Sequence, residues 1–560
     1  MTFCADVAAV SDPAAGSGNF LTESYLSLRR LENDILRETI TDKSGTGVLG
    51  FEEEEFNPIQ VTIQQFYGIE INDFAVSVAK TAIWIAEAQM FKETEAIIHK
   101  EMDFLPLHTN ANIHEGNALQ MDWNDVIPAG ELSYIMGNPP FVGARLMSKE
   151  QKKDTINVFG ADWVNVGNLD YVSNWFKIAV DYIRGTEVKT AFVSTNSVSQ
   201  GSMVSDLWRP LFDGNLKIFF AHRTFKWNSE SIDSASVFCV IVGFTFSKQE
   251  KGPFLVYAGT SMEKVANINP YLFNGPNIFI GSRSKAITPR PPIGIGNKPV
   301  DGGGYLFTKS EMEDFIAKEP NAKSYFKLWY GAKEWIANAP RYCLWLGKTS
   351  PSVIKQMPYC LERVNYVRNF RLNSKSAGTR KLADTPTRFH VENMPKNNFI
   401  IVPKTSSENR RYLPIGFASP EILVSDAVFI ITDAELSHFG ILISNVHMAW
   451  MRTVCGRLKS DYRYSKDIVY NNFPWPTPTA KQKERIEKTA QGILDARALY
   501  PNESLAALYD PTLMPKELRY AHRANDKAVM DAYGFSTAMT EEDCVAELLK
   551  LYEALVHNEQ

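Results

Sequence analysis

The stretch SDPAAGSGNF, residues 11–20, decides the fold of the first part of the chain. It joins an acidic residue to an aromatic one through small residues and two glycines. A glycine-rich loop that follows a strand and opens a helix brings main-chain N–H groups close to a ligand, because glycine has no Cβ to hold the ligand away. The loop contains no lysine, which argues against a phosphate loop. Taken alone, it could also be an ordinary tight strand-to-helix turn.

Strand and helix patterns alternate on both sides of this loop, over residues 1–245. A short apolar run precedes the loop, and apolar residues recur at helical spacing after it. β-rich runs follow as VTIQQFYGIEIND, YIMGNPPF, KTAFVSTNS, LKIFFAHRTF and ASVFCVIVGF. This alternation predicts an α/β fold, an open and mostly parallel Rossmann-like sheet with helices on both faces. Ligands then bind at the carboxyl ends of the strands.

Length and composition indicate a globular protein of several domains. The 560 residues correspond to about three domains, at roughly 150 residues for each. The six cysteines include no C-x-x-C pair, so we expect no metal site and no disulfide framework, and a reducing, cytoplasmic location. No apolar run reaches the roughly 18 residues of a membrane span. The net charge of −5 means that any nucleic-acid surface must be a local basic patch.

The texture of the chain changes near residue 250. Turns rich in glycine, proline and asparagine, many aromatic residues and clustered Arg/Lys follow, without a sustained helical period. The proline-punctuated NNFPWPTPTA ends this region, and two amphipathic helical segments come after it. We therefore predict an α/β domain over 1–249, a mixed α+β domain over 250–476 and a C-terminal helical segment over 477–560.

Three more signals follow the glycine loop in order. Glu70 ends the second predicted strand, where a carboxylate can accept hydrogen bonds from both ribose hydroxyls. Asn117, in EGNAL after a third strand, could meet an adenine edge, although an asparagine beside glycine is more often a turn residue. The last signal is Asn138-Pro139-Pro140-Phe141, directly after the apolar run SYIMG.

The Asn-Pro-Pro-Phe segment carries a specific chemistry. Two prolines fix φ and remove N–H donors, so the chain leaves the strand as a rigid arch with free carbonyls. The amide oxygen of Asn138 and the carbonyl of Pro139 then form a cradle of two acceptors for an exocyclic amino group. Phe141 offers a face for stacking. Asn-Pro at a strand end is also a common turn, so the segment is informative mainly through the signals that precede it.

Taken together, these residues resemble the γ-class amino-methyltransferases, which use S-adenosylmethionine and methylate N6 of adenine in DNA. Other segments are similar to the methyltransferase, target-recognition and C-terminal parts of the Type IIL, MmeI-like restriction–modification family: FVSTNSVSQG, FAHRTFKW, VPKTSSENRRYLPIGF, GRLKSDYRYSKDIVYNNFPWP and LRYAHRANDKAVMDAYG. The resemblance covers nearly the whole chain. It implies a site-specific, adenine-specific DNA methyltransferase that flips its target base out of duplex DNA, within a restriction–modification or related defence system.

The resemblance also implies the site residues. The residues that it places at the reacting base are Asn138, Pro139, Pro140 and Phe141. Those that it places at S-adenosylmethionine are Asp12, Ala14, Gly16, Gly18, Asn19, Phe20, Glu70, Asn117 and Ala118.

Sequence selection is expected in the second domain, where basic residues cluster. Residues 361–390 carry seven Arg/Lys against two acids, and KTSSENRRY and RLKSDYRYSK add two further groups. Such a mixture suits contacts to phosphates and the reading of guanine edges by arginine, although a basic stretch can also be a solvated face. The candidate DNA contacts are Arg371, Lys375, Arg380, Lys381, Lys404, Arg410, Arg411, Arg457, Lys459 and Arg463.

Two departures from the family pattern leave alternatives open. Family members carry a nuclease domain, a helical connector and a further cofactor motif before the glycine loop, whereas this chain begins too late to contain them. We therefore expect double-stranded DNA as a partner, together with a separate N-terminal or nuclease chain. Ala15 also stands where the related loop often has cysteine. The alternatives are a DNA-binding fragment or specificity subunit with little activity alone, and a methyltransferase that acts on RNA or protein.

Overall fold

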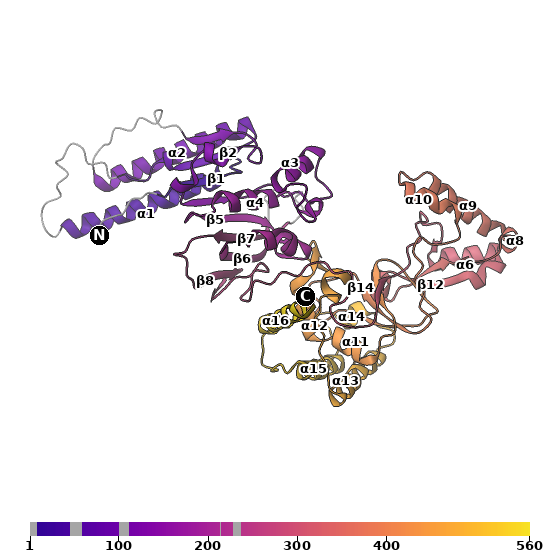
Figure 1. Ribbon diagram of the computed structural model, residues 1–560. Coiled ribbons are helices and arrows are strands. Elements are labelled where there is room, and N and C mark those ends of the chain that lie inside the picture. Colours follow the sequence, from indigo (N-terminus) through magenta and orange to yellow (C-terminus); the bar gives the residue numbers. More distant parts are fainter. Residues whose placement is uncertain (1–7, 45–58, 100–110, 213, 228–236, 560) are drawn as a thin grey trace. The chain divides into compact units, whose positions relative to one another are not determined.

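A computed structural model describes residues 8–44, 59–99, 111–212, 214–227 and 237–559 (Figure 1). The chain divides into two compact units, Met1–Phe279 and Ile280–Gln560, which are described separately below. No helix in the described ranges is both long and apolar enough to cross a membrane.

The first unit is built on a nine-stranded sheet in the order β3-β2-β1-β4-β5-β7-β6-β8-β9. The five strands from β3 to β5 pair in parallel, β7 is antiparallel to both β5 and β6, and β9 is antiparallel to β8. The predicted open α/β sheet is confirmed, with a mixed far half. The strands are β1 (Val10–Asp12), β2 (Phe66–Glu70), β3 (Asn112–Glu115), β4 (Tyr134–Gly137), β5 (Lys189–Thr195), β6 (Lys217–Trp227), β7 (Val237–Thr245), β8 (Phe254–Ala258) and β9 (Ser261–Val265).

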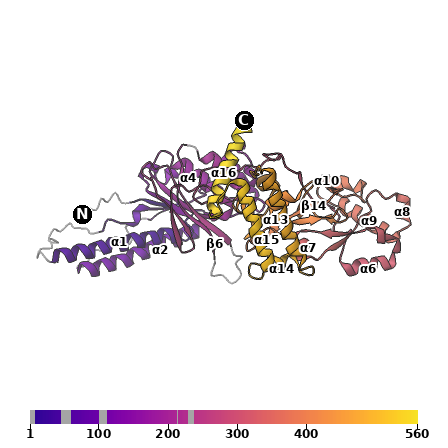
Figure 2. The same cartoon turned by 90° about the horizontal axis from the view of Figure 1, so that it is seen from below.

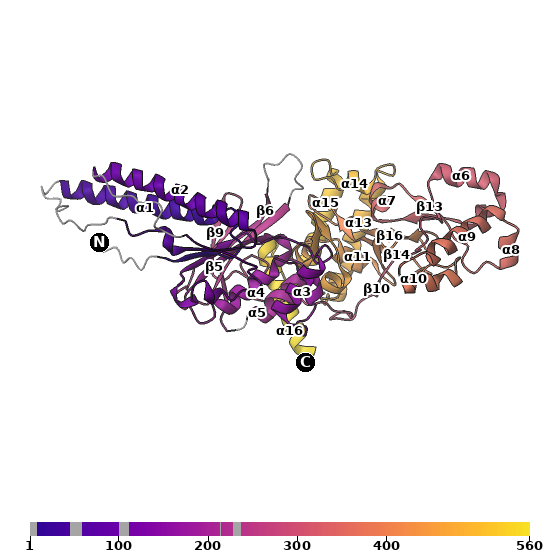
Figure 3. The ribbon, with the colours of Figure 1, turned by 90° about the horizontal axis from the view of Figure 1, so that it is seen from above.

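Helices cover both faces of this sheet. Figure 3 shows α1 (Asn19–Ser44) and α2 (Asp73–Ile98) side by side on one face, with α4 (Ser173–Tyr182) on the other. The shorter helices α3 (Lys149–Phe159) and α5 (Arg209–Leu211) flank α4 in the sequence. Apolar residues of α1, α2 and β2, such as Tyr25, Ile83 and Phe66, are fully buried together. This packing holds the short strand β1 in the middle of the parallel half.

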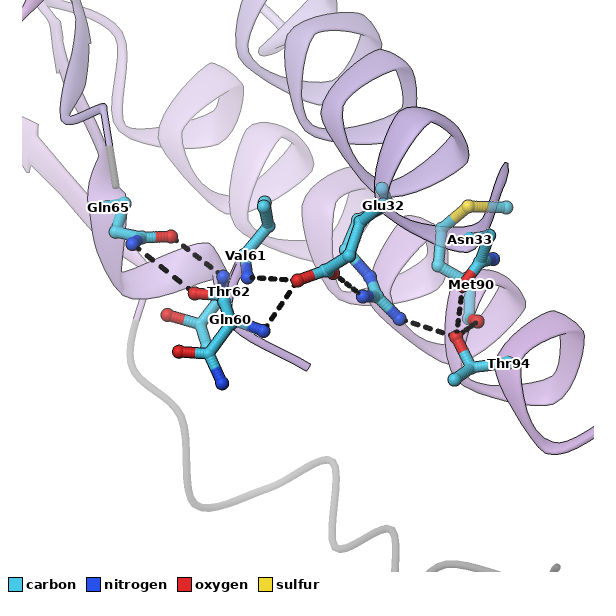
Figure 4. Close-up of polar contacts among 9 residues, drawn as sticks. Glu32, Asn33, Gln60, Val61, Thr62, Gln65, Met90 and Thr94 are labelled. Atoms are coloured by element: carbon cyan, nitrogen blue, oxygen red, sulfur yellow. Dashed lines mark hydrogen bonds and ion pairs between the residues drawn. The ribbon is translucent and has the colours of Figure 1, made fainter. Parts of the chain in front are cut away.

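A buried polar network ties α1 and α2 to the segment that leads into β2 (Figure 4). Arg29 pairs with Glu32 and donates to Oγ1 of Thr94 at 2.7 Å. Glu32 in turn accepts from the main-chain N–H of Gln60 at 2.7 Å and of Val61 at 3.3 Å. Because buried charges are tolerated only when paired and hydrogen-bonded, this network stabilises one arrangement of the helix pair.

The second unit contains three small sheets, in the orders β10-β18-β14-β16, β11-β13-β12-β17 and β15-β20-β19. Their strands are β10 (Ile293–Ile295), β11 (Leu306–Phe307), β12 (Phe326–Tyr330), β13 (Arg341–Leu344), β14 (Phe399–Pro403), β15 (Thr405–Ser406), β16 (Gly416–Ala418), β17 (Leu423–Val424), β18 (Val428–Ile431), β19 (Gly456–Leu458) and β20 (Asp461–Arg463). This mixed architecture agrees with the predicted α+β type.

The second unit contains helices both before residue 475, where the sequence shows no sustained helical period, and after it. They are α6 (Lys309–Lys318), α7 (Ala332–Ala337), α8 (Pro351–Lys355), α9 (Pro358–Leu372), α10 (Ala377–Lys381), α11 (Leu436–Leu442), α12 (Asn445–Val454), α13 (Ala480–Ala498), α14 (Leu505–Leu508), α15 (Lys516–Tyr533) and α16 (Glu541–Glu559). The expected lack of a sustained helix is wrong for the 15-residue α9, whose buried stripe contains an arginine. An ionised residue in that stripe hides the helical period.

The predicted C-terminal helical segment is present as α13 to α16. Figures 1 and 2 show α13 and α15 side by side, and their buried faces contain Ile486, Ile493, Leu518 and Val529. A capping box formed by Thr479 and Gln482 begins α13. The boundaries of the three predicted domains stay a prediction.

Candidate functional site

The carboxyl edge of the parallel strands brings the four predicted segments together. Adjacent strands β3, β2, β1 and β4 end next to Asn117, Glu70, the glycine loop and Asn138 respectively. Parallel strands end at the same edge of a sheet, so residues from distant parts of the sequence lie in one row.

The two glycines of the loop serve different purposes. Gly18 has φ +81°, and a Cβ added to it would lie 2.8 Å from Cβ of Ala79 on α2. This glycine is needed for close packing of the loop on the helix. Gly16 has φ +54° with no atom within 4 Å of an added Cβ. The open space above Gly16 leaves room for a ligand against the backbone.

Glu70 holds the loop in place. One of its carboxylate oxygens, Oε2, accepts from the N–H of Gly16 at 2.9 Å, and the other, Oε1, accepts from the N–H of Asn72 at 2.9 Å. Asn72 is the N-cap of α2, so one side chain joins the loop to the start of that helix. Each carboxylate oxygen has a second lone pair, which leaves acceptor capacity for a ligand hydroxyl.

Asp12 is a buried acid with an unused oxygen. The residue is fully buried, its Oδ1 accepts from the N–H of Ala14 at 2.9 Å, and its Oδ2 has no hydrogen-bond partner. The pKa of this carboxyl is raised to about 7, chiefly by burial; the bond from Ala14 acts against the rise, and nearby Glu70 adds to it. A Cβ on Gly137 would lie 2.5 Å from Oδ1 of Asp12, so glycine at that position makes room for the acid. The unpartnered oxygen suits a cationic donor.

Asn138 presents a second unused acceptor. Its Oδ1 atom is buried and has no hydrogen-bond partner. Pro139 is buried behind it, whereas Phe141 is half-buried and Pro140 is exposed. A buried amide oxygen without a partner is costly unless a ligand supplies a donor.

The chain after Phe141 is fixed by a residue that the sequence does not single out. Asp170 accepts from the N–H of Val142 at 3.2 Å, and the carbonyl of Val142 accepts from the N–H of Tyr171 at 3.0 Å. Asp170 is buried, and this burial raises its pKa.

Asn117 uses its side chain within the protein. Its Oδ1 accepts from the N–H of Leu119 at 3.0 Å, and its Nδ2 donates to Asp154 at 3.4 Å. Asp154 also accepts from Gln120 at 2.8 Å and from the hydroxyl of Tyr171 at 3.1 Å. These contacts are those of a turn residue, and the neighbouring Ala118 is buried. The predicted contact of Asn117 with an adenine edge stays a prediction.

Asn19 and Phe20 lie at the start of α1 and line a hollow of about 570 Å³ together with Val10, Glu23, Ser24, Ser27, Leu28, Tyr134 and Met136. Neither Gly16 nor Glu70 lines this hollow. The loop is also held by Trp175, whose indole N–H donates to the carbonyl of Pro13 at 3.0 Å. Trp175, Asp154 and Asp170 each hydrogen-bond to a predicted site segment, and a single sequence does not distinguish them from ordinary core residues.

Arg371 does not occupy the surface position predicted for it. It is fully buried, and its five N–H donors reach five main-chain carbonyls: those of Pro299, Val300, Leu382, Thr385 and Arg388. Since a guanidinium has five donors, none remains for a phosphate. The structure thus corrects the assignment of Arg371 from a DNA contact to a structural residue. By contrast, Lys375, Arg380 and Lys381 are exposed at and before α10.

The remaining basic residues surround the sheet β15-β20-β19. Pairing of β15 with β20 brings the segments KTSSENRRY and RLKSDYRYSK side by side. Arg411, Lys459 and Arg463 are exposed, whereas Lys404, Arg410 and Arg457 are half-buried. Arg457 pairs with Glu408 at 3.5 Å, which leaves it less available than the exposed three.

The described residues contain no group of three or more His, Cys, Asp or Glu side chains placed to hold a metal ion.

Profiles of one family match the chain from end to end. The MmeI DNA-methyltransferase domain matches residues 6–257, the MmeI target recognition domain residues 274–477 and the MmeI C-terminal domain residues 478–558. DNA methyltransferase A of Bacillus subtilis (strain 168) is 42% identical over 548 residues, which are 97% of this chain and 61% of that relative. This chain thus spans less than two thirds of the length of the Bacillus relative.

A solved structure gives the same result. The Type IIL restriction–modification enzyme MmeI, in complex with DNA, is 41% identical and superimposes with a TM-score of 0.88. The match covers 99% of this chain and 73% of that one.

Proposed function

This chain belongs to the MmeI family of Type IIL restriction–modification enzymes, and we propose that it methylates N6 of adenine at a specific site in duplex DNA. The methyl donor is S-adenosylmethionine. The observation that carries this proposal is the buried, unpartnered Oδ1 of Asn138, which follows β4 at the sheet edge that also holds the glycine loop.

The residues at this edge fit S-adenosylmethionine. The unpartnered Oδ2 of Asp12 would accept from the ammonium of its amino-acid part, and the space above Gly16 leaves the loop backbone open to it. The carboxylate of Glu70 has lone pairs left for the ribose hydroxyls. When bound, the cofactor supplies an electrophilic methyl group on a sulfonium; as the N–C bond forms, the S–C bond breaks and a neutral thioether leaves, and N6 then loses one proton to water.

The Asn-Pro-Pro-Phe segment would receive the base. Adenine N6 is a weak nucleophile, because its lone pair is delocalised into the ring. Oδ1 of Asn138 and the carbonyl of Pro139 would accept its two hydrogens, favouring a pyramidal nitrogen and stabilising the positive charge that develops on it. Extraction of the base from the stack costs a few kcal/mol, which stacking on Phe141 helps to offset.

Duplex DNA as the substrate is supported by the match of residues 274–477 to a target recognition domain. The exposed cations Lys375, Arg380, Lys381, Arg411, Lys459 and Arg463 are the candidate contacts. Half or more of the hydrogen bonds in protein–DNA complexes go to the backbone, so most of these residues would position the duplex and a minority would read bases.

Transfer of tritiated methyl groups tests the proposal. Duplex DNA, single-stranded DNA, RNA and total protein are each incubated with the chain and labelled S-adenosylmethionine. We expect label in duplex DNA, and its loss in Asn138→Ala. Asn124→Ala is a matched control, because this exposed asparagine lies in the loop between β3 and β4. Label in RNA or protein alone would replace DNA as the substrate, and binding of DNA without label would favour a specificity subunit. Addition of the product of the neighbouring gene tests the expected separate partner chain.

A further inference from the structure

At the carboxyl edge of the first sheet, four large apolar side chains are unusually exposed to solvent. Ile71 and Phe74 after β2 are 67% and 75% exposed, and Leu146 and Val164 after β4 are 83% and 69% exposed. The other exposed large apolar side chains in the described part of this unit reach at most 55%. Single exposed leucines are ordinary on protein surfaces, but the concentration of the most exposed ones at a single edge is not.

Leu146 is the most exposed of the four and the nearest in sequence to Phe141. It closes a tight turn, since its N–H donates to the carbonyl of Gly143 at 2.8 Å. Five residues of chain span at most about 18 Å, so the turn lies within that distance of Phe141. Arg145, next to it in the turn, is exposed as well.

The turn is fixed at both ends. Before it, Val142 is held by Asp170 and Tyr171 through the bonds described above. After it, Met147 is buried, and Ser148 begins α3 with a capping box in which Gln151 accepts from the N–H of Ser148 at 2.9 Å. Because the backbone on both sides of the turn is fixed, the Leu146 side chain stays exposed to solvent and cannot fold back onto the protein surface.

Flipping of a base creates a need for an apolar group at this place. Extraction of adenine leaves its partner thymine unpaired and opens a gap between the neighbouring base pairs. Proteins that bend DNA insert leucine, isoleucine, phenylalanine or methionine side chains between base steps, so the base stack can accept an apolar side chain. Burial of the leucine side chain against bases would then offset part of the unstacking energy.

We propose that Leu146 is the wedge that enters the duplex and takes the place of the flipped adenine. This inference rests on the proposed function, because it assumes that duplex DNA is the substrate. Ile71 and Phe74 adjoin Glu70 on the side assigned to the cofactor, and Val164 follows α3, farther along the chain from Phe141.

A comparison of two duplexes isolates the wedge. The first carries the site that the wild-type chain methylates, as mapped by sequencing of methylated DNA. The second is identical except that the target adenine faces an abasic position, so that no base pair has to be broken. For Leu146→Gly, we expect kcat/KM to fall by about tenfold to a hundredfold on the paired duplex, the range for burying a leucine side chain. On the abasic duplex, we expect a fall of about twofold, because flipping there costs less.

Two matched variants complete the test. Leu146→Met keeps an apolar wedge and should retain activity on both duplexes, and Val164→Gly should leave both rates unchanged. Equal losses of Leu146→Gly on the two duplexes, or no loss on either, would overturn the wedge while the proposed function stands. If the wild-type chain methylates no DNA at all, both the proposed function and the wedge are overturned.

Discussion

Asp12 and Asn138, at the carboxyl edge of the first sheet, differ from Arg371, in the second unit, in how their buried polar atoms are satisfied. At the edge, Oδ2 of Asp12 and Oδ1 of Asn138 are buried without a partner. In the second unit, all five donors of the buried Arg371 reach main-chain carbonyls. The two unsatisfied oxygens lie at the strand ends where the sequence motifs predict a ligand, whereas the fully bonded Arg371 is part of the scaffold.

The largest expected effect is the loss of methyl transfer in Asn138→Ala. We expect kcat to fall by about a hundredfold to a thousandfold, as when one preorganised electrostatic partner of a transition state is removed. Affinity for S-adenosylmethionine, measured by calorimetry, should stay within a few fold, because the proposed function places Asn138 at the base and not at the cofactor. An equal loss of cofactor affinity would mean that Asn138 contacts S-adenosylmethionine and not the base.

The second prediction concerns the stabilising role of the buried Arg371. Arg371→Met should lower the free energy of unfolding of the full chain by about 3 kcal/mol or more, because five buried carbonyls lose their donors. Arg368→Met is the matched surface variant, because Arg368 is exposed on the same helix α9, and it should change stability by less than about 0.5 kcal/mol. Urea titration checks both variants. Similar small changes for the two would mean that Arg371 is not the structural residue described here.

The third prediction returns to the edge. Glu70→Ala should weaken S-adenosylmethionine binding by about 1.5–3 kcal/mol, the range for hydrogen bonds to a charged group. Glu115 pairs with Glu70 across β2 and β3 but is exposed, so Glu115→Ala should leave the affinity unchanged. Calorimetry that finds no difference between the two variants would remove Glu70 from the cofactor site.

Asp12 makes cofactor affinity depend on pH. Its pKa is raised from 3.8 to about 7, chiefly by burial, so the free protein holds this proton at acidic pH. An ammonium ligand needs the ionised form, so affinity should rise about eightfold from pH 6 to pH 7.5 as the ionised fraction grows. Asp12→Asn should remove this dependence in calorimetric titrations across that range. A slope that persists in the variant would assign the titration to another group.

The sign for folding stability is the reverse. In the unfolded chain Asp12 loses its proton near pH 3.8, whereas in the folded chain it keeps it until about pH 7. The folded state therefore binds more protons between these values, and the contribution of Asp12 to stability falls as pH rises through this window.

The smallest effect belongs to the exposed cations. Each phosphate that a cation neutralises contributes a slope of about −0.9 to the dependence of log K on log salt. Arg380→Ala and Lys381→Ala should each flatten the slope for DNA binding by up to about one unit and weaken all sequences alike. The buried Arg371 should make no such contribution. Unchanged slopes in Arg380→Ala and Lys381→Ala would mean that α10 has no role in DNA binding.

The sequence predicts the α/β sheet of the first unit better than the basic residues of the second unit. Alternation of apolar runs indicates the α/β sheet, because each short run must lie between helices that cover it. The antiparallel position of β7 does not follow, because a β-rich run carries no sign of its direction.

Whether a charged residue is exposed or buried depends on tertiary contacts, which the composition of a segment does not show. Arg371 lies in the buried stripe of α9 with Cys360, Val364 and Val367. Two of its five carbonyl partners, Pro299 and Val300, lie 72 and 71 residues away in sequence. Asp154 and Asp170 likewise act through residues that only the fold brings near. Charge clusters therefore predict a nucleic-acid surface less securely than motifs in a required order do.

The identity of the methylated nucleoside decides whether this chain transfers methyl groups to adenine N6. DNA from a strain without adenine methylation is treated with the wild-type chain and S-adenosylmethionine, digested to nucleosides and examined by mass spectrometry. The unpartnered acceptors of the carboxyl edge predict N6-methyladenine as the product, and its absence after treatment with Asn138→Ala. A product of methylated cytosine, or no methylated nucleoside at all, would contradict the account.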